Sequence, residues 1–106
     1  TGLRLVLPDG SAMVEAAHII PFGESGDDDP RNGLALTPDM HWAMDQSLIA
    51  PDTEYRWRVS PRLDERIPDH RIFTALAGKP LILPAEARMY PRRDALEWRL
   101  KTLRPA

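Results

Sequence analysis

The stretch from Glu15 to Asp45 constrains this chain most, because it places two of the three histidines around an Asn-Gly dipeptide. Asn32 follows His18 by 14 positions and precedes His41 by nine. An imidazole at a strand end can accept a proton near neutral pH, and a second imidazole on a helix can bind a metal ion. An asparagine between them can tie down the intervening loop through its side-chain amide. The order His, Asn, His therefore predicts a polar site built from a strand, a loop and a helix.

Two short apolar runs predict strands on either side of an acidic loop. The first strand is expected over residues 12–19, after a Pro-Asp-Gly turn that joins it to residues 3–7, because such a turn between apolar runs favours a hairpin. The next strand is expected over residues 33–36. The acids between them, at positions 24–29, lack the Gly and distal Glu spacing of a calcium loop. We therefore interpret the acidic loop as a solvated turn.

A helix is expected to begin after Thr37 and to run to about Ser47. Thr-Pro at this point is typical of an N-cap followed by a first-turn proline. His41 and Asp45 are four positions apart, so both should project from nearly the same face of this helix.

The remainder of the chain predicts a second hairpin and further helices. The expected elements are a hairpin of residues 48–50 and 55–60, a helix over 68–77 that ends at Gly78, a short strand or extended piece over 81–83 and a helix over 92–104. In the last helix, Leu96, Leu100 and Leu103 form one apolar stripe. The three tryptophans, Trp42, Trp57 and Trp98, are interpreted as packing residues.

The segments AAHIIP, RNGLAL and TPDMH resemble the signatures of the HNH endonucleases. The match is to the subgroup in which the first signature reads AAHI where Asp-His is commoner, and LIAPD, RVSPRL and ALEW resemble that subgroup's tail. The resemblance implies an α+β fold with a ββα-metal core: the strand ending at His18, the strand over 33–36 and the helix after Thr37. It also implies metal-dependent hydrolysis of DNA phosphodiester bonds. A restriction-type enzyme is expected, because the chain has no basic surplus and the DNA readout should then come from another domain or a second subunit.

The resemblance assigns roles to the site residues. His18 is the expected general base, Asn32 fastens the loop that aims it, and His41 binds one divalent ion. Mg²⁺ or Mn²⁺ is the expected ion, with Zn²⁺ or Ni²⁺ as alternatives. The residues alone also permit plainer interpretations: a strand-end histidine bonded to backbone, an Asn-Gly turn and a solvent-facing helix histidine.

Ala17 departs from the commoner signature of the family, which has Asp at this position. In the family that Asp is the second metal ligand, and alanine cannot coordinate a metal. Asp45 is the best substitute ligand, although it could equally pair with an arginine or cap the turn at Leu48. Glu15 is ranked lower, because three positions along a strand turn it to the face opposite His18.

Composition limits the partners. The 106 residues include 14 basic and 16 acidic side chains, for a net charge of −2, without the basic surplus usual in DNA-binding domains. Arg31, Arg56 and Arg58 are the candidate DNA contacts, and the other arginines are interpreted as solvated. An additional DNA-recognition domain or a homodimer is therefore expected. The absence of Cys excludes disulfides and thiolate zinc sites.

The chain is expected to form a single HNH nuclease domain over residues 1–106, as the C-terminal part of a longer protein, because its Thr1-Gly2 start resembles an internal point of the family. No apolar run approaches the roughly 20 residues that cross a bilayer, so we expect a cytoplasmic protein without membrane contact. Two alternatives remain open. One is a catalytically degenerate HNH-fold module that binds DNA or acts as a scaffold. The other is a zinc or small-molecule domain that uses the set His18, His41, His70 and Asp45.

Overall fold

The computed structural model describes residues 14–105, and its first elements form the ββα core that the sequence predicts. Strand β1 (Glu15–His18) pairs antiparallel with β2 (Gly33–Leu36), and helix α2 (Pro38–Asp45) follows directly. The predicted strand over residues 3–7 and its turn lie outside the described residues. The structure therefore confirms the ββα core within an α+β fold.

Alternation along β1 and β2 decides which face of the hairpin meets the helix. Ala17 pairs with Leu34, and both are buried together with Leu36 against Met40 and other apolar residues of α2. The neighbouring pair, Ala16 and Ala35, is exposed on the opposite face. The hairpin is therefore packed on one side only, as expected for period-two alternation.

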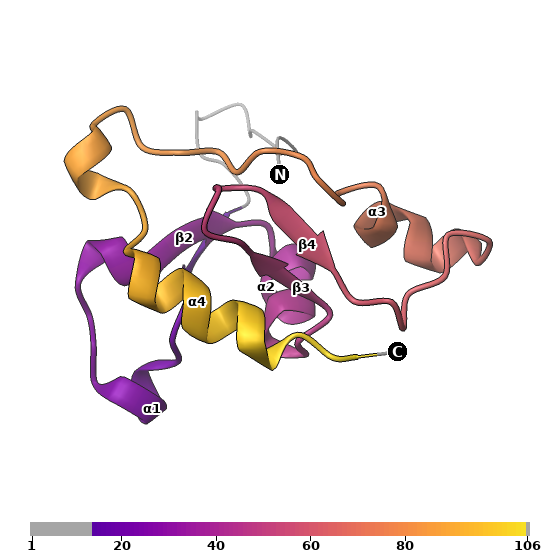
Figure 1. Cartoon of the computed structure of the whole chain (residues 1–106), viewed down its shortest axis with the longest axis horizontal. Helices are drawn as coiled ribbons and strands as arrows, with labels where there is room; N and C mark the ends of the chain where they lie inside the picture. Colours follow the sequence, from indigo (N-terminus) through magenta and orange to yellow (C-terminus); the bar gives the residue numbers. More distant parts are fainter. Residues whose placement is uncertain (1–13, 106) are drawn as a thin grey trace.

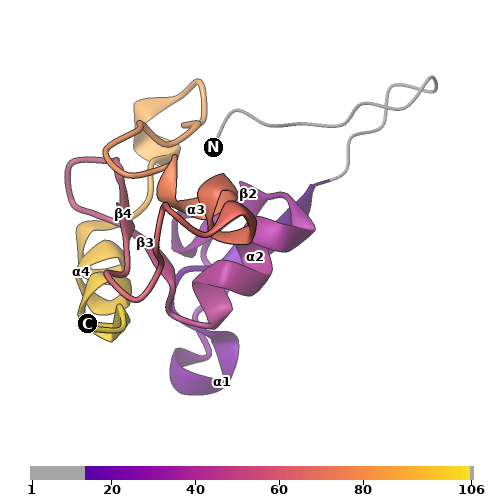
Figure 2. The ribbon, with the colours of Figure 1, turned by 90° about the vertical axis from the view of Figure 1, so that its right-hand side faces the viewer.

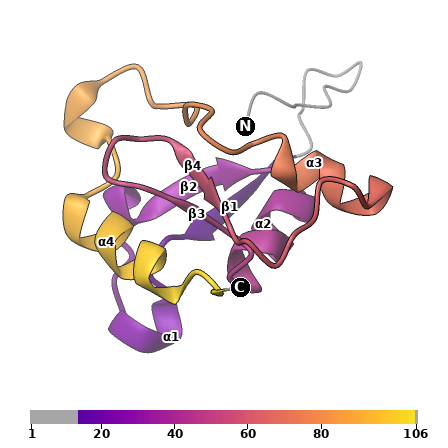
Figure 3. The ribbon, with the colours of Figure 1, turned by 45° about the vertical axis from the view of Figure 1, so that its right-hand side comes forward.

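The second hairpin confirms its prediction and lies between two helices. Strand β3 (Ile49–Pro51) pairs antiparallel with β4 (Trp57–Val59). Helix α4 (Arg93–Thr102) packs on β3 from one side and α2 from the other (Figures 1–3). The segment between α3 (Arg71–Thr74) and α4, orange in Figure 1, crosses the molecule from one helix to the other.

The connections differ in detail from the prediction. Between the first strands lie α1 (Phe22–Ser25) and a 3-10 turn η1 (Pro30–Asn32); two further turns are η2 (Pro68–His70) and η3 (Ala87–Met89). The predicted helix over 68–77 is shorter, being η2 followed by α3, although its chain does turn at Gly78 with a φ of +78°. The predicted strand over 81–83 does not form; instead residues 78–81 run beside Trp57 through backbone hydrogen bonds.

Two side-chain predictions hold only in part. The buried stripe of α4 consists of Ala95, Leu96 and Arg99, whereas Leu100 and Leu103 are only half-buried. Trp57 is a core residue at 1% exposure, but Trp42 is 54% exposed on the outer face of α2. In α4, Arg99 follows Leu96 by three positions and so shares its face, which means that helical spacing predicts the face but not which of its residues the core covers.

Within residues 14–105, no helix has the length and apolar character needed to cross a membrane.

Candidate functional site

His18 lies at the end of β1, where the strand leaves the sheet. Its Nε2 is 2.8 Å from Oδ1 of Asp28, and the two side chains are 38% and 80% exposed. The ring also lies against Phe22, with ring centroids 5.8 Å apart. His18 lines a surface hollow of about 500 Å³ together with Ala16 and Ala35 of the outer hairpin face. The imidazole is therefore held at the surface and reachable from solvent.

Asn32 is fully buried and joins both ends of the loop that follows His18. Its Oδ1 accepts from the Ile20 N–H at 2.9 Å, and its Nδ2 donates to the carbonyl oxygens of Ile20 and Asp27 at 3.0 and 2.9 Å. Its own carbonyl accepts from the Ile19 N–H at 2.8 Å. Asn32 thus satisfies the backbone immediately after His18, which is the geometry that a loop-fastening role requires. The link from this geometry to catalysis stays a prediction.

His41 contacts two carboxylates, one on each ring nitrogen. Nδ1 is 3.2 Å from Oε1 of Glu15, and Nε2 is 3.4 Å from Oδ2 of Asp45. Glu15 was expected to be a poorer metal ligand than Asp45 because it should face away from His18, and the two side chains do lie on opposite faces of β1. Glu15 shares the face of Ala17, which packs toward α2, so it reaches His41 instead.

The donor chemistry at His41 fits a divalent ion held by two side chains. Within residues 14–105, no three His, Cys, Asp or Glu side chains form a group that could hold a metal. An imidazole nitrogen beside a carboxylate oxygen still suits a divalent cation, and Mg²⁺ commonly keeps several waters. His70 is used elsewhere, because its Nδ1 accepts from the Asp64 N–H at 3.0 Å. The four-residue set proposed for the zinc alternative is therefore not brought together.

The candidate DNA-contacting arginines are engaged inside the chain. Arg31 donates to Asp29 at 2.8 Å, Arg58 to Asp52 at 2.9 Å, and Arg56 to the Gly78 carbonyl at 2.9 Å. The Arg31 side chain is the main reason that the pKa of Asp29 falls to about 2. Every arginine in residues 14–105 likewise has an intramolecular acceptor. Each of the three candidate guanidinium groups keeps further N–H donors beyond these bonds, so phosphate contact would add to the internal bonds.

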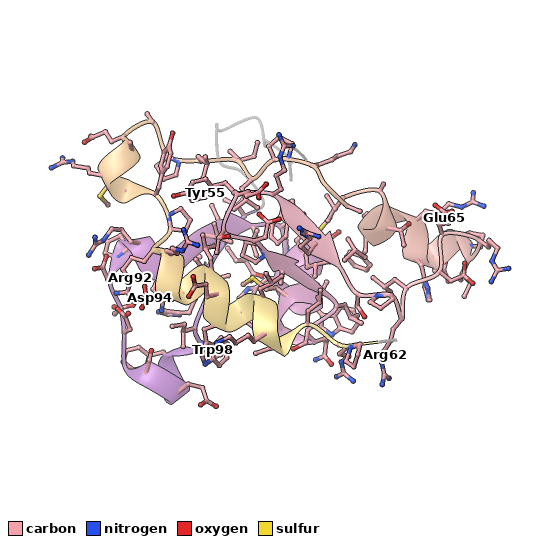
Figure 4. All side chains as sticks on the ribbon, viewed as in Figure 1. Tyr55, Arg62, Glu65, Arg92, Asp94 and Trp98 are labelled. Atoms are coloured by element: carbon pink, nitrogen blue, oxygen red, sulfur yellow. The ribbon has the colours of Figure 1, made fainter. Side chains whose placement is uncertain are left out.

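The acidic loop is fastened to α4, which corrects its interpretation as a solvated turn. Arg92, the N-cap residue of α4, donates to Asp94, which lies beside it in Figure 4. It also donates to Asp27, and its guanidinium lies 3.9 Å from Asp29. Two hydrogen bonds lower the pKa of Asp27: the larger effect comes from the Asp29 N–H and the smaller one from Arg92. The loop that carries Asp28 is therefore anchored on both sides.

Replacing Arg92 with Met is expected to raise the pKa of Asp27 part of the way to its ordinary value, since the Asp29 N–H bond remains. A carboxyl whose folded pKa is lowered stabilises the fold above its unfolded pKa of 3.8, and this contribution is lost as the pH falls through the folded value. Loop amides should thus exchange faster in the variant at pH 6, with the difference fading in acid. NMR titration and hydrogen exchange measure both effects.

Arg88→Met is the matched control, because Arg88 pairs with exposed Glu86 outside this loop. An unchanged Asp27 pKa in the Arg92 variant would show that the loop does not depend on Arg92.

Arg99 is a buried residue that sequence reasoning missed. Its guanidinium is 2.7 Å from the Ile19 oxygen, 3.1 Å from the Met44 oxygen and 3.4 Å from the His18 oxygen, and the residue is 3% exposed. Burial lowers its pKa, and nearby Asp45 opposes this. Arg99 thus joins the end of β1 to the end of α2. The sequence does contain a sign of this burial, because Arg99 lies three positions after Leu96 on the apolar stripe of an amphipathic helix.

Comparisons with known proteins agree with this geometry. Residues 1–50 match the HNH_2 family, whose description is HNH endonuclease. This match, over just under half of the chain, supports membership of the HNH endonuclease family. Its fold is similar to the solved structure of the modification dependent TagI restriction endonuclease, with a TM-score of 0.67 over 96% of this chain at 20% identity. The match covers 31% of that protein, and no curated protein sequence matches. Family and fold together support a nuclease.

Proposed function

We propose that this HNH domain hydrolyses DNA phosphodiester bonds with the help of one divalent ion, as part of a restriction-type enzyme. The observation that carries the proposal is the buried Asn32, which fastens the loop between His18 and the helix of His41 and Asp45. The three signature positions of the family thus occupy a strand end, a buried loop anchor and a helix face.

His18 is the proposed general base, which takes a proton from the water that attacks phosphorus. A neutral imidazole is a suitable acceptor at the operating pH. Asp28 contacts Nε2 but is 80% exposed, so water readily competes for this contact. Asn32 then keeps the backbone after His18 in place while the nucleophile is activated.

His41 and Asp45 are the proposed side chains that hold the ion, with Mg²⁺ or Mn²⁺ favoured by the small donor set. When bound, such an ion would neutralise the phosphate and stabilise the leaving oxygen. The DNA would have to reach both sides of the end of β1, because His41 contacts Glu15 on one face of the strand and His18 contacts Asp28 on the other. Glu15 contributes through His41, as argued below.

DNA recognition is assigned to parts of the enzyme beyond this domain or to a second copy. The chain carries a net charge of −2, and Arg31 and Arg58 are each paired with an aspartate, so their DNA contacts stay a prediction. The TagI restriction endonuclease is much longer than this chain, which supports an additional domain. Restriction-type activity is proposed from the same likeness.

A degenerate DNA-binding module is the second candidate. Ala17 is 2% exposed in the core and offers no ligand. Among residues 14–105, His41 and Asp45 form a pair and no third His, Cys, Asp or Glu completes a metal-binding group with them. A cleavage assay on supercoiled plasmid with Mg²⁺ or Mn²⁺, with EDTA as control, separates the two candidates. Metal-dependent nicks or breaks support the nuclease. DNA binding without cleavage of modified or unmodified plasmid would support the module.

Metal affinity should depend on both proposed ligands. We expect His41→Ala and Asp45→Asn each to weaken Mn²⁺ binding by at least about tenfold, because each removes one donor from a small set. Calorimetric titration measures the affinity, with Asp69→Asn as a control on an exposed acid of η2. Equal affinity in Asp45→Asn and the parent would show that Asp45 only supports the helix. Ala17→Asp should not restore binding, since position 17 is buried in the core.

A further inference from the structure

We propose that Glu15 is a positioning residue for His41: its carboxylate accepts the Nδ1–H and so leaves the Nε2 lone pair directed toward Asp45. This inference rests on the proposed metal site at His41 and Asp45. It assigns a role to a residue outside the His, Asn, His signature.

The two carboxylates contact different ring nitrogens of His41, Glu15 at Nδ1 and Asp45 at Nε2. A neutral imidazole has one N–H and one lone pair, so it can donate to only one carboxylate. Nδ1 is 3.2 Å from Glu15, within hydrogen-bond range, and Nε2 is 3.4 Å from Asp45. An ion bound at Nε2 would require the lone pair on that nitrogen, which leaves the proton on Nδ1, where Glu15 can accept it. The lone pair of Nε2 and the carboxylate of Asp45 then face each other, an arrangement that a cation stabilises.

The strand register explains how Glu15 reaches the helix. Glu15 pairs with Leu36, the last residue of β2, and only Thr37 separates Leu36 from the start of α2. Glu15 also shares a face with Ala17, which is buried toward α2. The first residue of β1 is therefore placed beside the first turn of the helix, next to His41.

The geometry favours orientation of His41 over direct coordination by Glu15. Glu15 and Asp45 contact different nitrogens of one ring, so they lie on opposite sides of it. An ion at Nε2 is thus shared with Asp45 and not with Glu15. A carboxylate that accepts the second N–H of a metal-binding histidine fixes its tautomer and raises its basicity, and removing such a partner costs about 10–100-fold in metal affinity.

The test compares Glu15→Ala with Glu15→Gln by two measurements. Nitrogen NMR of the His41 ring in the metal-free protein reports the tautomer, and calorimetric titration reports Mn²⁺ affinity. In Glu15→Ala we expect the Nδ1–H tautomer to lose its preference and the affinity to fall about 10–100-fold. In Glu15→Gln the amide oxygen still accepts the N–H, so the tautomer and most of the affinity should be retained. Glu97→Gln is the matched control, because Glu97 is a half-exposed acid on α4 that pairs with Arg93.

Three results would overturn the proposal. An unchanged tautomer in Glu15→Ala would show that Glu15 does not set the position of the ring proton. An unchanged Mn²⁺ affinity in the same variant would show that Glu15 does not affect metal binding. Loss in Glu15→Gln as large as in Glu15→Ala would make Glu15 a direct ligand, since an amide is a poor replacement for a coordinating carboxylate. A parent protein that binds no Mn²⁺ would instead overturn the proposed metal site, while the ring nitrogens still decide the Glu15 contact.

Discussion

Replacing His18 with alanine is expected to slow DNA cleavage by about 10²–10⁴-fold, the usual contribution of a general base. The fold should be retained, because the His18 side chain is 38% exposed and the strand is held by its backbone pairing with Gly33. Mn²⁺ affinity should also be retained, because His41 makes its contacts with other residues. Single-turnover cleavage kinetics at saturating metal measure the effect.

His70→Ala is the matched control for this loss, since His70 is a half-buried histidine that bonds to the Asp64 N–H. The cleavage rate of His70→Ala should stay within about twofold of the parent rate, a change far smaller than the loss expected when a general base is removed. If folded His18→Ala cleaved DNA at the parent rate, the base assignment would be wrong and a different acceptor would have to be sought.

Replacing Arg99 with methionine is expected to lower the free energy of unfolding by about 3–5 kcal/mol. Methionine keeps much of the apolar stem but removes the donors to the carbonyl oxygens of Ile19 and Met44. Each buried acceptor left without a partner costs roughly 1–3 kcal/mol. A small domain has a total stability of only about 5–15 kcal/mol, so this is a large fraction of it. Urea denaturation followed by tryptophan fluorescence measures the change.

Arg93→Met is the control on the same helix, because the Arg93 side chain is 78% exposed and pairs only with Glu97. An exposed pair of this kind contributes about 0–1 kcal/mol. Arg99→Lys should lie between the two, since an ammonium can reach fewer of the carbonyl groups. Equal stability of Arg99→Met and Arg93→Met would falsify the view that Arg99 joins β1 to α2.

The local elements of the core were predictable because their signals lie within a few residues. The Thr-Pro start of α2 follows from N-cap and first-turn preferences, and Thr37 is the N-cap residue. Its hydroxyl does not bond to the helix backbone, however, and instead donates to Asp39 at 2.5 Å. Short-range preference thus located the helix start but not the contact made there.

Pairings between distant residues were not predictable in the same way. The arginines were interpreted as solvated or DNA-facing, yet Arg92 reaches the acidic loop 65 positions earlier. Charge alone cannot identify such partners, because any of the 16 acidic side chains is a candidate until the chain is folded. The same holds for Glu15, whose distance from His41 in sequence is 26 positions.

The sequence by itself determined the family, the ββα order and the residue types of the site, because these depend on motif spacing and local backbone preference. Only the tertiary structure decided that Glu15 meets His41 and that Arg99 is buried behind His18. Both results come from packing: alternation turns Glu15 toward α2, and docking of α4 on β3 removes Arg99 from water. Spacing along a chain predicts which side of an element a residue occupies, whereas the partner on that side is set by how the elements pack.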